Sequence, residues 1–151
     1  MNGLEFYLRG GSVEYRCSDD RLAPLAVLLS SDVGNNFGRC LDVLDSVSKA
    51  TAGEKAQEYP GNIYTAIFVG DTVRVEHNFL EETAEYGLGD VQRAAEEYWT
   101  VLLRKPDDPN FSRHLRPDLP EYLAYLYFWE ETWQEPHPYR GRLGIPAQGS
   151  E

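Results

Sequence analysis

The fold is decided first by the stretch IYTAIFVGDTVRVEHNF, residues 63–79, which has the pattern of two strands joined by a tight turn. The dipeptide Gly70-Asp71 suits a two-residue type II′ turn, because glycine at the first central position tolerates a positive φ. A turn at this point fixes the register of the predicted hairpin. The pairs that then face each other are Tyr64 with His77, Ala66 with Val75, and Phe68 with Val73.

The two predicted strands of this hairpin differ in their hydrophobic pattern. Residues 63–69 are apolar on both faces, which is typical of a central strand. Residues 72–79 alternate between apolar and polar side chains, so we expect this strand to be half exposed. The side chains expected to point inward are Val73, Val75 and Phe79.

A second hairpin is predicted nearer the N-terminus, at residues 4–17. The dipeptide Gly10-Gly11 is a two-residue turn signal, and alternating apolar residues flank it on both sides. The pairs expected on one common apolar face are Leu8 with Val13, Phe6 with Tyr15, and Leu4 with Cys17.

Three stretches carry apolar residues at helical spacing, and they are residues 36–50, 88–105 and 121–133. Asn35 or Asn36 can cap the first of these helices, and Asp90 is the expected N-cap of the second. The third helix carries aromatic side chains on nearly all of its sides, so it is either deeply buried or partly a contact surface. A shorter helix is expected to begin near Pro24.

These elements predict an α+β protein, with an antiparallel sheet built from the two hairpins and packed against two or three helices. A length of 151 residues is usual for one domain and sufficient for a hydrophobic core. We expect residues 1–133 to form that single domain. Residues 134–151 are rich in proline and glycine, which predicts an irregular or mobile tail.

The composition narrows the classes of partner. The chain has 25 acidic and 14 basic side chains and a formal net charge of −11. This charge disfavours binding to nucleic acid or to an anionic membrane, and it attracts a basic partner. No apolar stretch approaches the ~18 residues that a membrane span requires, and the first residues lack the pattern of a signal peptide. We therefore expect a cytoplasmic protein whose two cysteines, Cys17 and Cys40, are reduced.

Few residues stand in patterns that carry catalysis. The sequence has no G-x-S-x-G motif, no P-loop and no dinucleotide fingerprint, and its histidines and cysteines lack metal-ligand spacing. His77 is expected to be a satisfied histidine at the edge of the core, and Cys40 a small core residue. His114 lies in a short basic cluster that either holds a phosphate or pairs with nearby acids. We expect no enzymatic activity, no cofactor and no metal.

The most informative charge pattern is an acidic segment at residues 71–97. It contains eight acidic side chains against only Arg74 and Arg93, a net charge of 2 − 8 = −6. Such a surface can dock a basic groove of a partner, although a merely solvated acidic face is the simpler alternative. The residues proposed for partner binding are Glu76, Glu81, Glu82, Glu85, Asp90, Glu96 and Glu97.

The same region resembles a known family. The run Tyr64–Val75, the acidic loop after it, and the helix start Leu88-Gly89-Asp90-Val91 with Tyr98 further on, resemble the YacL-like family. That family is similar in outline to immunity proteins of contact-dependent growth inhibition systems. The resemblance covers roughly residues 62–104. It implies a small cytosolic protein that binds and neutralises a cognate toxin domain, often a nuclease, and it transfers no individual site residue.

Three functions therefore compete. The leading hypothesis is an immunity protein that neutralises a toxin domain through its acidic surface, because nucleases are typically basic at their substrate groove. The second is a general protein–protein adaptor that uses the aromatic helix at residues 121–133. The third is a small enzyme whose site is assembled from loops.

Overall fold

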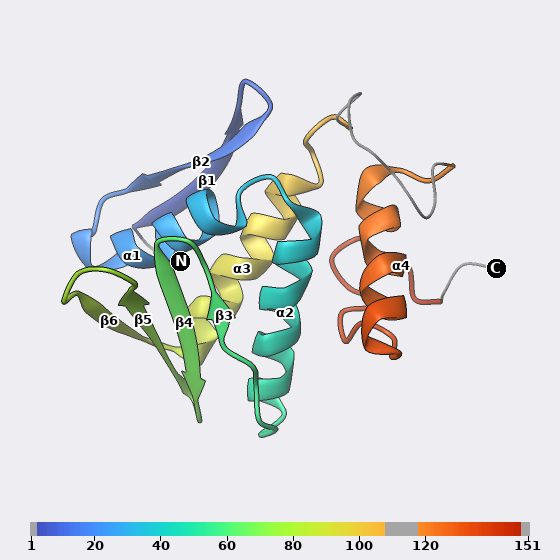
Figure 1. Cartoon of the computed structure of the whole chain (residues 1–151). Coiled ribbons are helices and arrows are strands. Elements are labelled where there is room, and N and C mark those ends of the chain that lie inside the picture. The colour runs from blue at the N-terminus through green and yellow to red at the C-terminus, as the bar shows by residue number, and fades with distance from the viewer. Residues whose placement is uncertain (1–2, 108–117, 149–151) are drawn as a thin grey trace.

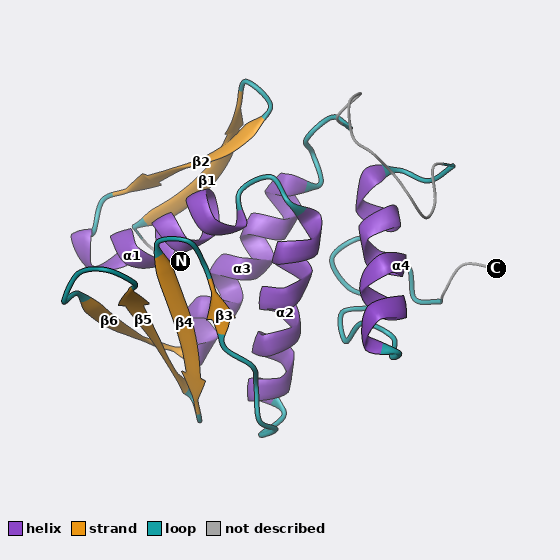
Figure 2. Cartoon of the chain, viewed as in Figure 1, coloured by secondary structure: helices purple, strands orange, loops and turns teal. Residues whose placement is uncertain are grey.

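The computed structural model of the protein describes residues 3–107 and 118–148 and confirms an α+β fold (Figure 2). The strands are β1 Leu4–Arg9, β2 Ser12–Cys17, β3 Tyr59–Pro60, β4 Tyr64–Val69, β5 Thr72–His77 and β6 Thr83–Gly87. The principal helices are α1 Ala23–Val27, α2 Phe37–Thr51, α3 Leu88–Leu102 and α4 Glu121–Trp133. A 3-10 turn at Asp20–Leu22 precedes α1, and a π-helical turn at Leu28–Val33 follows it.

Both predicted hairpins are present with the predicted registers. Leu4, Phe6 and Leu8 face Cys17, Tyr15 and Val13, and Tyr64, Ala66 and Phe68 face His77, Val75 and Val73. Gly10 and Gly11 have φ values of 61° and 82°, and Gly70 has 61°, which a side chain would adopt only under strain. The turn glycines therefore set the strand pairing, as their positions in the sequence predicted.

The two hairpins lie in separate sheets rather than in one. The strands β1 and β2 form a two-stranded sheet, and the other sheet has the order β3-β4-β5-β6. The central position predicted for residues 63–69 is confirmed, since β4 lies between β3 and β5. The pattern did not indicate β6, whose short sequence TAEYG contains an acid and a glycine and becomes a strand by pairing with β5.

Two details of the predicted elements are wrong. Asp90 is not the N-cap of α3, because the helix begins at Leu88 and Gly87 caps it with an extended backbone. Phe79 does not point inward, since β5 ends at His77 and the Phe79 side chain is 81% exposed. The strand β6 leads directly into α3, which places the start of that helix earlier than the pattern indicated.

The helices form the centre of the molecule (Figure 1). The helix α2 lies between the four-stranded sheet and α4, and it packs against both α3 and α4. Its Asn36 side chain accepts a hydrogen bond from the Arg39 N–H at 2.9 Å, as an N-cap should. The predicted core position of Cys40 is confirmed, since its side chain is fully buried.

The C-terminal segment, residues 134–148, has the irregular backbone that its prolines and glycines predicted, but it packs onto the helices. His137, Tyr139 and Ile145 are buried, and His137 Nε2 lies 2.9 Å from the Leu41 carbonyl oxygen on α2. The segment therefore completes the core and does not hang free as a tail. No helix within residues 3–107 and 118–148 is long and apolar enough to cross a membrane.

Candidate functional site

The seven acidic residues proposed from the sequence divide into two groups in the structure. Glu76 on β5 and Glu85 on β6 lie on the outer face of the four-stranded sheet, and Glu81 and Glu82 lie in the loop between these strands. Glu81, Glu82 and Glu85 are exposed. We call these four acids, together with the loop residues that lie between them in the chain, the β5–β6 surface.

The other three acids lie on α3 and serve the fold. Glu97 accepts a hydrogen bond from the Phe6 N–H on β1 at 3.2 Å. Glu96 accepts one from the Tyr139 hydroxyl at 2.7 Å and forms an ion pair with Arg142. Asp90 forms an ion pair with Arg93 on its own helix. Glu96 and Glu97 are therefore engaged away from the β5–β6 surface, whereas the Asp90 carboxylate lies close to Gly87 at the end of β6.

The outer face of the sheet carries only one cation among the acids of β5 and β6. Arg74 on β5 faces Glu85 across the ladder, and its Nε lies 2.7 Å from Glu76 Oε2. Both side chains of the Arg74–Glu76 pair are 41% exposed, so solvent screens the pair and its contribution to stability is small. The remaining charge of the β5–β6 surface is acidic and accessible to a partner.

The β5–β6 loop is held in one shape by His77 and the backbone around it. The His77 Nδ1 atom accepts hydrogen bonds from the N–H groups of Phe79 at 3.1 Å and Leu80 at 3.0 Å. The backbone N–H of His77 donates to the Glu82 carbonyl oxygen at 2.9 Å. The predicted role of His77 as a satisfied histidine is confirmed, and its ring also packs edge-on against Tyr64 at 5.0 Å.

Asn78 fastens the same loop to the strand next to it. Its backbone N–H donates to the Ile63 carbonyl oxygen at 2.7 Å, and its side-chain amide donates to the Gly61 carbonyl oxygen at 2.8 Å. The Thr65 hydroxyl donates to the Asn78 side-chain oxygen at 2.8 Å. Both ends of the Asn78 amide are thus used within the chain, and the loop is preorganised.

Glu82 is the one acid of the β5–β6 surface with a hydrogen-bonding role inside the domain. Its Oε2 accepts a hydrogen bond from the Tyr64 hydroxyl at 3.1 Å. Burial and the adjacent Glu82 carboxylate raise the pKa of Tyr64 to about 12, because both disfavour the phenolate. Glu82 therefore helps to fix the loop, whereas no such contact from residues 3–107 or 118–148 restrains Glu81.

This preorganised loop presents two large apolar side chains to solvent. Phe79 is 81% exposed and Leu80 is 63% exposed, and Glu81 and Glu82 follow them directly. Sequence reasoning missed these two residues because strand alternation placed Phe79 in the core. Only the end of β5 at His77 and the hydrogen bonds to His77 Nδ1 turn them outward.

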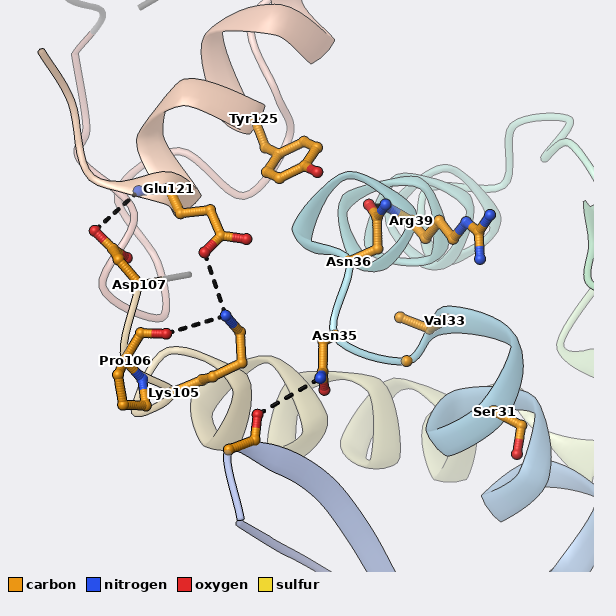
Figure 3. Close-up of a pocket in the computed structure, with 12 residues that line it drawn as sticks. Ser31, Val33, Asn35, Asn36, Arg39, Lys105, Pro106, Asp107, Glu121 and Tyr125 are labelled. Atoms are coloured by element: carbon orange, nitrogen blue, oxygen red, sulfur yellow. Dashed lines mark hydrogen bonds and ion pairs between the residues drawn. The ribbon is translucent and has the colours of Figure 1, made fainter. Parts of the chain in front are cut away.

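A second candidate is an open pocket of about 560 Å³ between the N-terminal end of α4, the end of α3 and the loop before α2 (Figure 3). Its buried Lys105 is paired, since Nζ lies 3.2 Å from Glu121 Oε1 and donates to the Pro106 carbonyl oxygen. Arg39 donates to the Asp32 carbonyl oxygen at 3.1 Å. Because the carboxylates of Asp107 and Glu121 balance the charges of Arg39 and Lys105 in its lining, the pocket offers an anionic ligand little electrostatic attraction.

The aromatic helix α4 is mostly a core element. Trp129 is buried, and its indole N–H donates to Asp42 Oδ1 at 2.9 Å. Leu126 is fully buried, whereas Phe128 and Trp133 remain 53% and 48% exposed. The helix is therefore buried on one face and exposed on another, and a contact role for its exposed face stays a prediction.

Groups that could carry chemistry are engaged or buried. Burial raises the pKa of the Cys40 thiol far above its usual range, so it is a poor nucleophile. Within the described ranges no group of three or more His, Cys, Asp or Glu side chains is arranged to hold a metal ion. The basic cluster around His114 lies outside the residues that the structure describes.

Comparison of the chain with models of protein families, with characterised proteins and with solved structures finds no match in any of the three. The β5–β6 surface combines exposed acidic and apolar side chains with a loop that hydrogen bonds hold in place.

Proposed function

We propose that the protein acts by binding a basic protein partner through the β5–β6 surface, and that this partner is a toxin domain, such as a nuclease, which it neutralises. The single observation that carries the proposal is the rigid display of Phe79 and Leu80 beside Glu81 and Glu82. The class of partner is supported by the resemblance of residues 62–104 to the YacL-like family, which is similar in outline to some immunity proteins, and by the net charge of −11.

The arrangement has the anatomy of a binding hot spot. Affinity at protein interfaces concentrates in a few well-packed apolar anchors surrounded by a polar rim. Phe79 and Leu80 would supply the anchors, and the surrounding glutamates would supply the rim. Because the loop is already held by His77 and Asn78, a partner would not have to order it, which lowers the entropic cost of association.

The rim glutamates would act mainly on the rate of association. Long-range attraction between exposed charges steers a basic partner towards the surface and is screened by salt, with a Debye length of about 10 Å at 0.1 M. A nuclease whose substrate groove is basic would be guided in this way, and its groove would then be covered.

The first experiment measures the affinity of a toxin domain encoded beside this chain's gene for Phe79→Ala, with Phe128→Ala on α4 as the matched control. Loss of an anchor should raise Kd about 30-fold or more, whereas loss of a side chain outside the contact should leave it within about threefold. The reverse ranking would favour the adaptor function of α4, for which the exposure of Phe128 and Trp133 is the supporting observation.

Charge reversal tests the rim separately. Glu81→Lys combined with Glu85→Lys should slow association and flatten its salt dependence, while Glu131→Lys on α4 should change neither. Both reversed positions are exposed, so the fold should be retained. Equal association rates at every salt concentration for wild type and the double reversal would contradict a steering role and leave the acids as a solvated face.

A further inference from the structure

Several outward edge groups of the two sheets are engaged within the part of the chain that the structure describes. On β1, the outward N–H of Phe6 donates to Glu97 at 3.2 Å, and on β2 the outward N–H of Val13 donates to Asn35 Oδ1 at 3.4 Å. The far side of β4 pairs with β3. Natural proteins close edges in such ways because an open edge is a template for another strand.

The strand β6 forms one edge of the four-stranded sheet, on the side away from α4 (Figure 1). The His77 N–H donates to the Glu82 carbonyl oxygen, and the Leu88 N–H donates to the Asp71 carbonyl oxygen. Between residues 82 and 88, the backbone N–H and C=O groups of the even-numbered residues therefore point toward β5. By the alternation of an antiparallel ladder, Thr83, Glu85 and Gly87 direct their N–H groups away from it.

This outer edge is open. Thr83, Glu85 and Gly87 are all exposed. A Cβ atom added at Gly87 would meet only the Asp90 carboxylate, at 3.8 Å. In the described part of the chain no side chain donates to or accepts from the outward backbone groups of β6, in contrast to the guards on β1 and β2.

We propose that β6 is a docking edge, to which the partner adds an extended segment of its own chain as a further strand. The inference rests on the proposed function and deepens it, because β6 begins directly after Glu81 and Glu82. A strand added there would continue onto Phe79 and Leu80. Backbone hydrogen bonds would supply affinity, and the apolar pair and the acids would supply specificity.

The side chains of the edge define the occupant. On the outer face of the sheet the added strand would lie next to Glu85, so a Lys or Arg at that position forms a favourable cross-strand pair. A second copy of this chain fits poorly, because antiparallel pairing of β6 with itself about Glu85 sets like charges opposite each other between molecules of net charge −11. The occupant is therefore a basic, extended segment of another protein.

The test removes an edge N–H without changing charge. Thr83→Pro deletes one outward donor and leaves the bonds to β5 intact, and Thr83→Val is the matched control that keeps the donor. The probe is a synthetic seven-residue peptide of alternating lysine and valine, with blocked ends, titrated at low salt. We expect Thr83→Pro to weaken peptide binding about tenfold, since a bond is lost and the ring obstructs the edge, and Thr83→Val to stay within about twofold.

A peptide with the same sequence and N-methylated backbone amides tests the same bonds without altering the protein, which covers a Thr83→Pro variant that fails to fold. It should bind at least about tenfold more weakly than the unmodified peptide. Equal binding of both peptides, equal binding to the proline and valine variants, or no binding of the basic peptide to the wild type would each overturn strand addition.

The inference and the proposed function fail separately. Toxin-domain binding that depends on Phe79 but is unaffected by Thr83→Pro would remove strand addition and keep the proposed function. Addition of the peptide to β6, seen as changed amide resonances of Thr83, Glu85 and Gly87, with no toxin domain bound, would remove the proposed function and keep the docking edge.

Discussion

At the scale of single residues, the two histidines in the described part of the chain illustrate how one ring can hold a backbone segment. His77 Nδ1 accepts from two N–H groups of the β5–β6 loop. His137 Nδ1 accepts from the Tyr139 N–H at 3.0 Å, and its Nε2 lies 2.9 Å from the Leu41 carbonyl oxygen. An Nδ1 atom that accepts carries no proton, so the His137 proton is on Nε2 and donates to Leu41. Protonation at Nδ1 would break the bond to Tyr139.

His137 should therefore make stability depend on pH. Burial lowers its pKa in the folded protein, so the unfolded chain, with a His pKa near 6.5, takes up the proton first as pH falls. The free energy of unfolding should decrease as pH falls below about 6.5. In His137→Gln the part of this pH dependence that comes from His137 should disappear. Urea denaturation between pH 5 and 7.5 measures the free energy of unfolding of both proteins. The variant keeps every carboxylate, so the same slope of unfolding free energy against pH in both proteins would show that His137 does not cause the dependence.

At the scale of elements, α2 and α4 show the difference between a one-sided and a many-sided apolar pattern. The stripe of α2 predicted its buried face correctly, because Phe37, Cys40, Leu41, Leu44 and Val47 are all buried. In α4 the aromatic residues on all sides did not distinguish the core face, which contains Leu126 and Trp129, from the exposed Phe128. A helix packed on one side needs a stripe for its orientation to be readable.

The apolar stripe of α2 predicts how much stability is lost when one of its buried side chains is shortened. Leu44 is fully buried, so Leu44→Ala removes packed atoms and leaves a cavity, which should lower the free energy of unfolding by about 2–5 kcal/mol. Glu54→Ala, at an exposed position just after the helix, should change it by less than about 0.5 kcal/mol. Urea denaturation compares the two variants, and similar midpoints would mean that the buried face of α2 is assigned incorrectly.

At the scale of the whole molecule, the C-terminal segment connects helices that are far apart in the sequence. The Tyr139 hydroxyl donates to Glu96 on α3, and the Trp99 indole N–H on α3 donates to the Leu143 carbonyl oxygen at 3.1 Å. Arg140 forms an ion pair with Glu130 on α4. Burial raises the pKa of Glu130, but the hydrogen bonds from Arg140 and from the His137 N–H, together with the nearby positive charge, lower it overall. The segment therefore holds α3 and α4 in their places around α2.

A chain that ends at Trp133 should be much less stable than one that ends at Gln148, which retains these contacts. The shorter chain loses the buried Ile145, worth roughly 1.5–3 kcal/mol, and leaves the Trp99 indole N–H without its acceptor, at a cost of about 1–3 kcal/mol. We expect a loss of roughly 3–6 kcal/mol in thermal or urea denaturation. Equal stability of the two chains would mean that the domain ends at residue 133.

Whether a feature depends on nearby or distant residues in the sequence explains which parts of the candidate site could be predicted. The acidic character of residues 71–97 follows from composition, and the outward direction of Glu76 follows from strand alternation. The exposure of Phe79 and Leu80 could not be predicted, because it depends on where β5 ends and on hydrogen bonds to His77 Nδ1. The roles of Glu96 and Glu97 could not be predicted either, since Tyr139 and Phe6 are distant in the sequence.

The sequence by itself determined the α+β class, the registers of both hairpins and the positions of the three long helices, because turn glycines and hydrophobic periods act between residues a few positions apart. Only the tertiary structure decided that the hairpins belong to different sheets, that the C-terminal segment closes the core, and that β6 keeps an open edge beside Phe79 and Leu80. These features depend on contacts between segments far apart in the chain, and no local spacing encodes which surfaces such contacts cover and which they leave exposed.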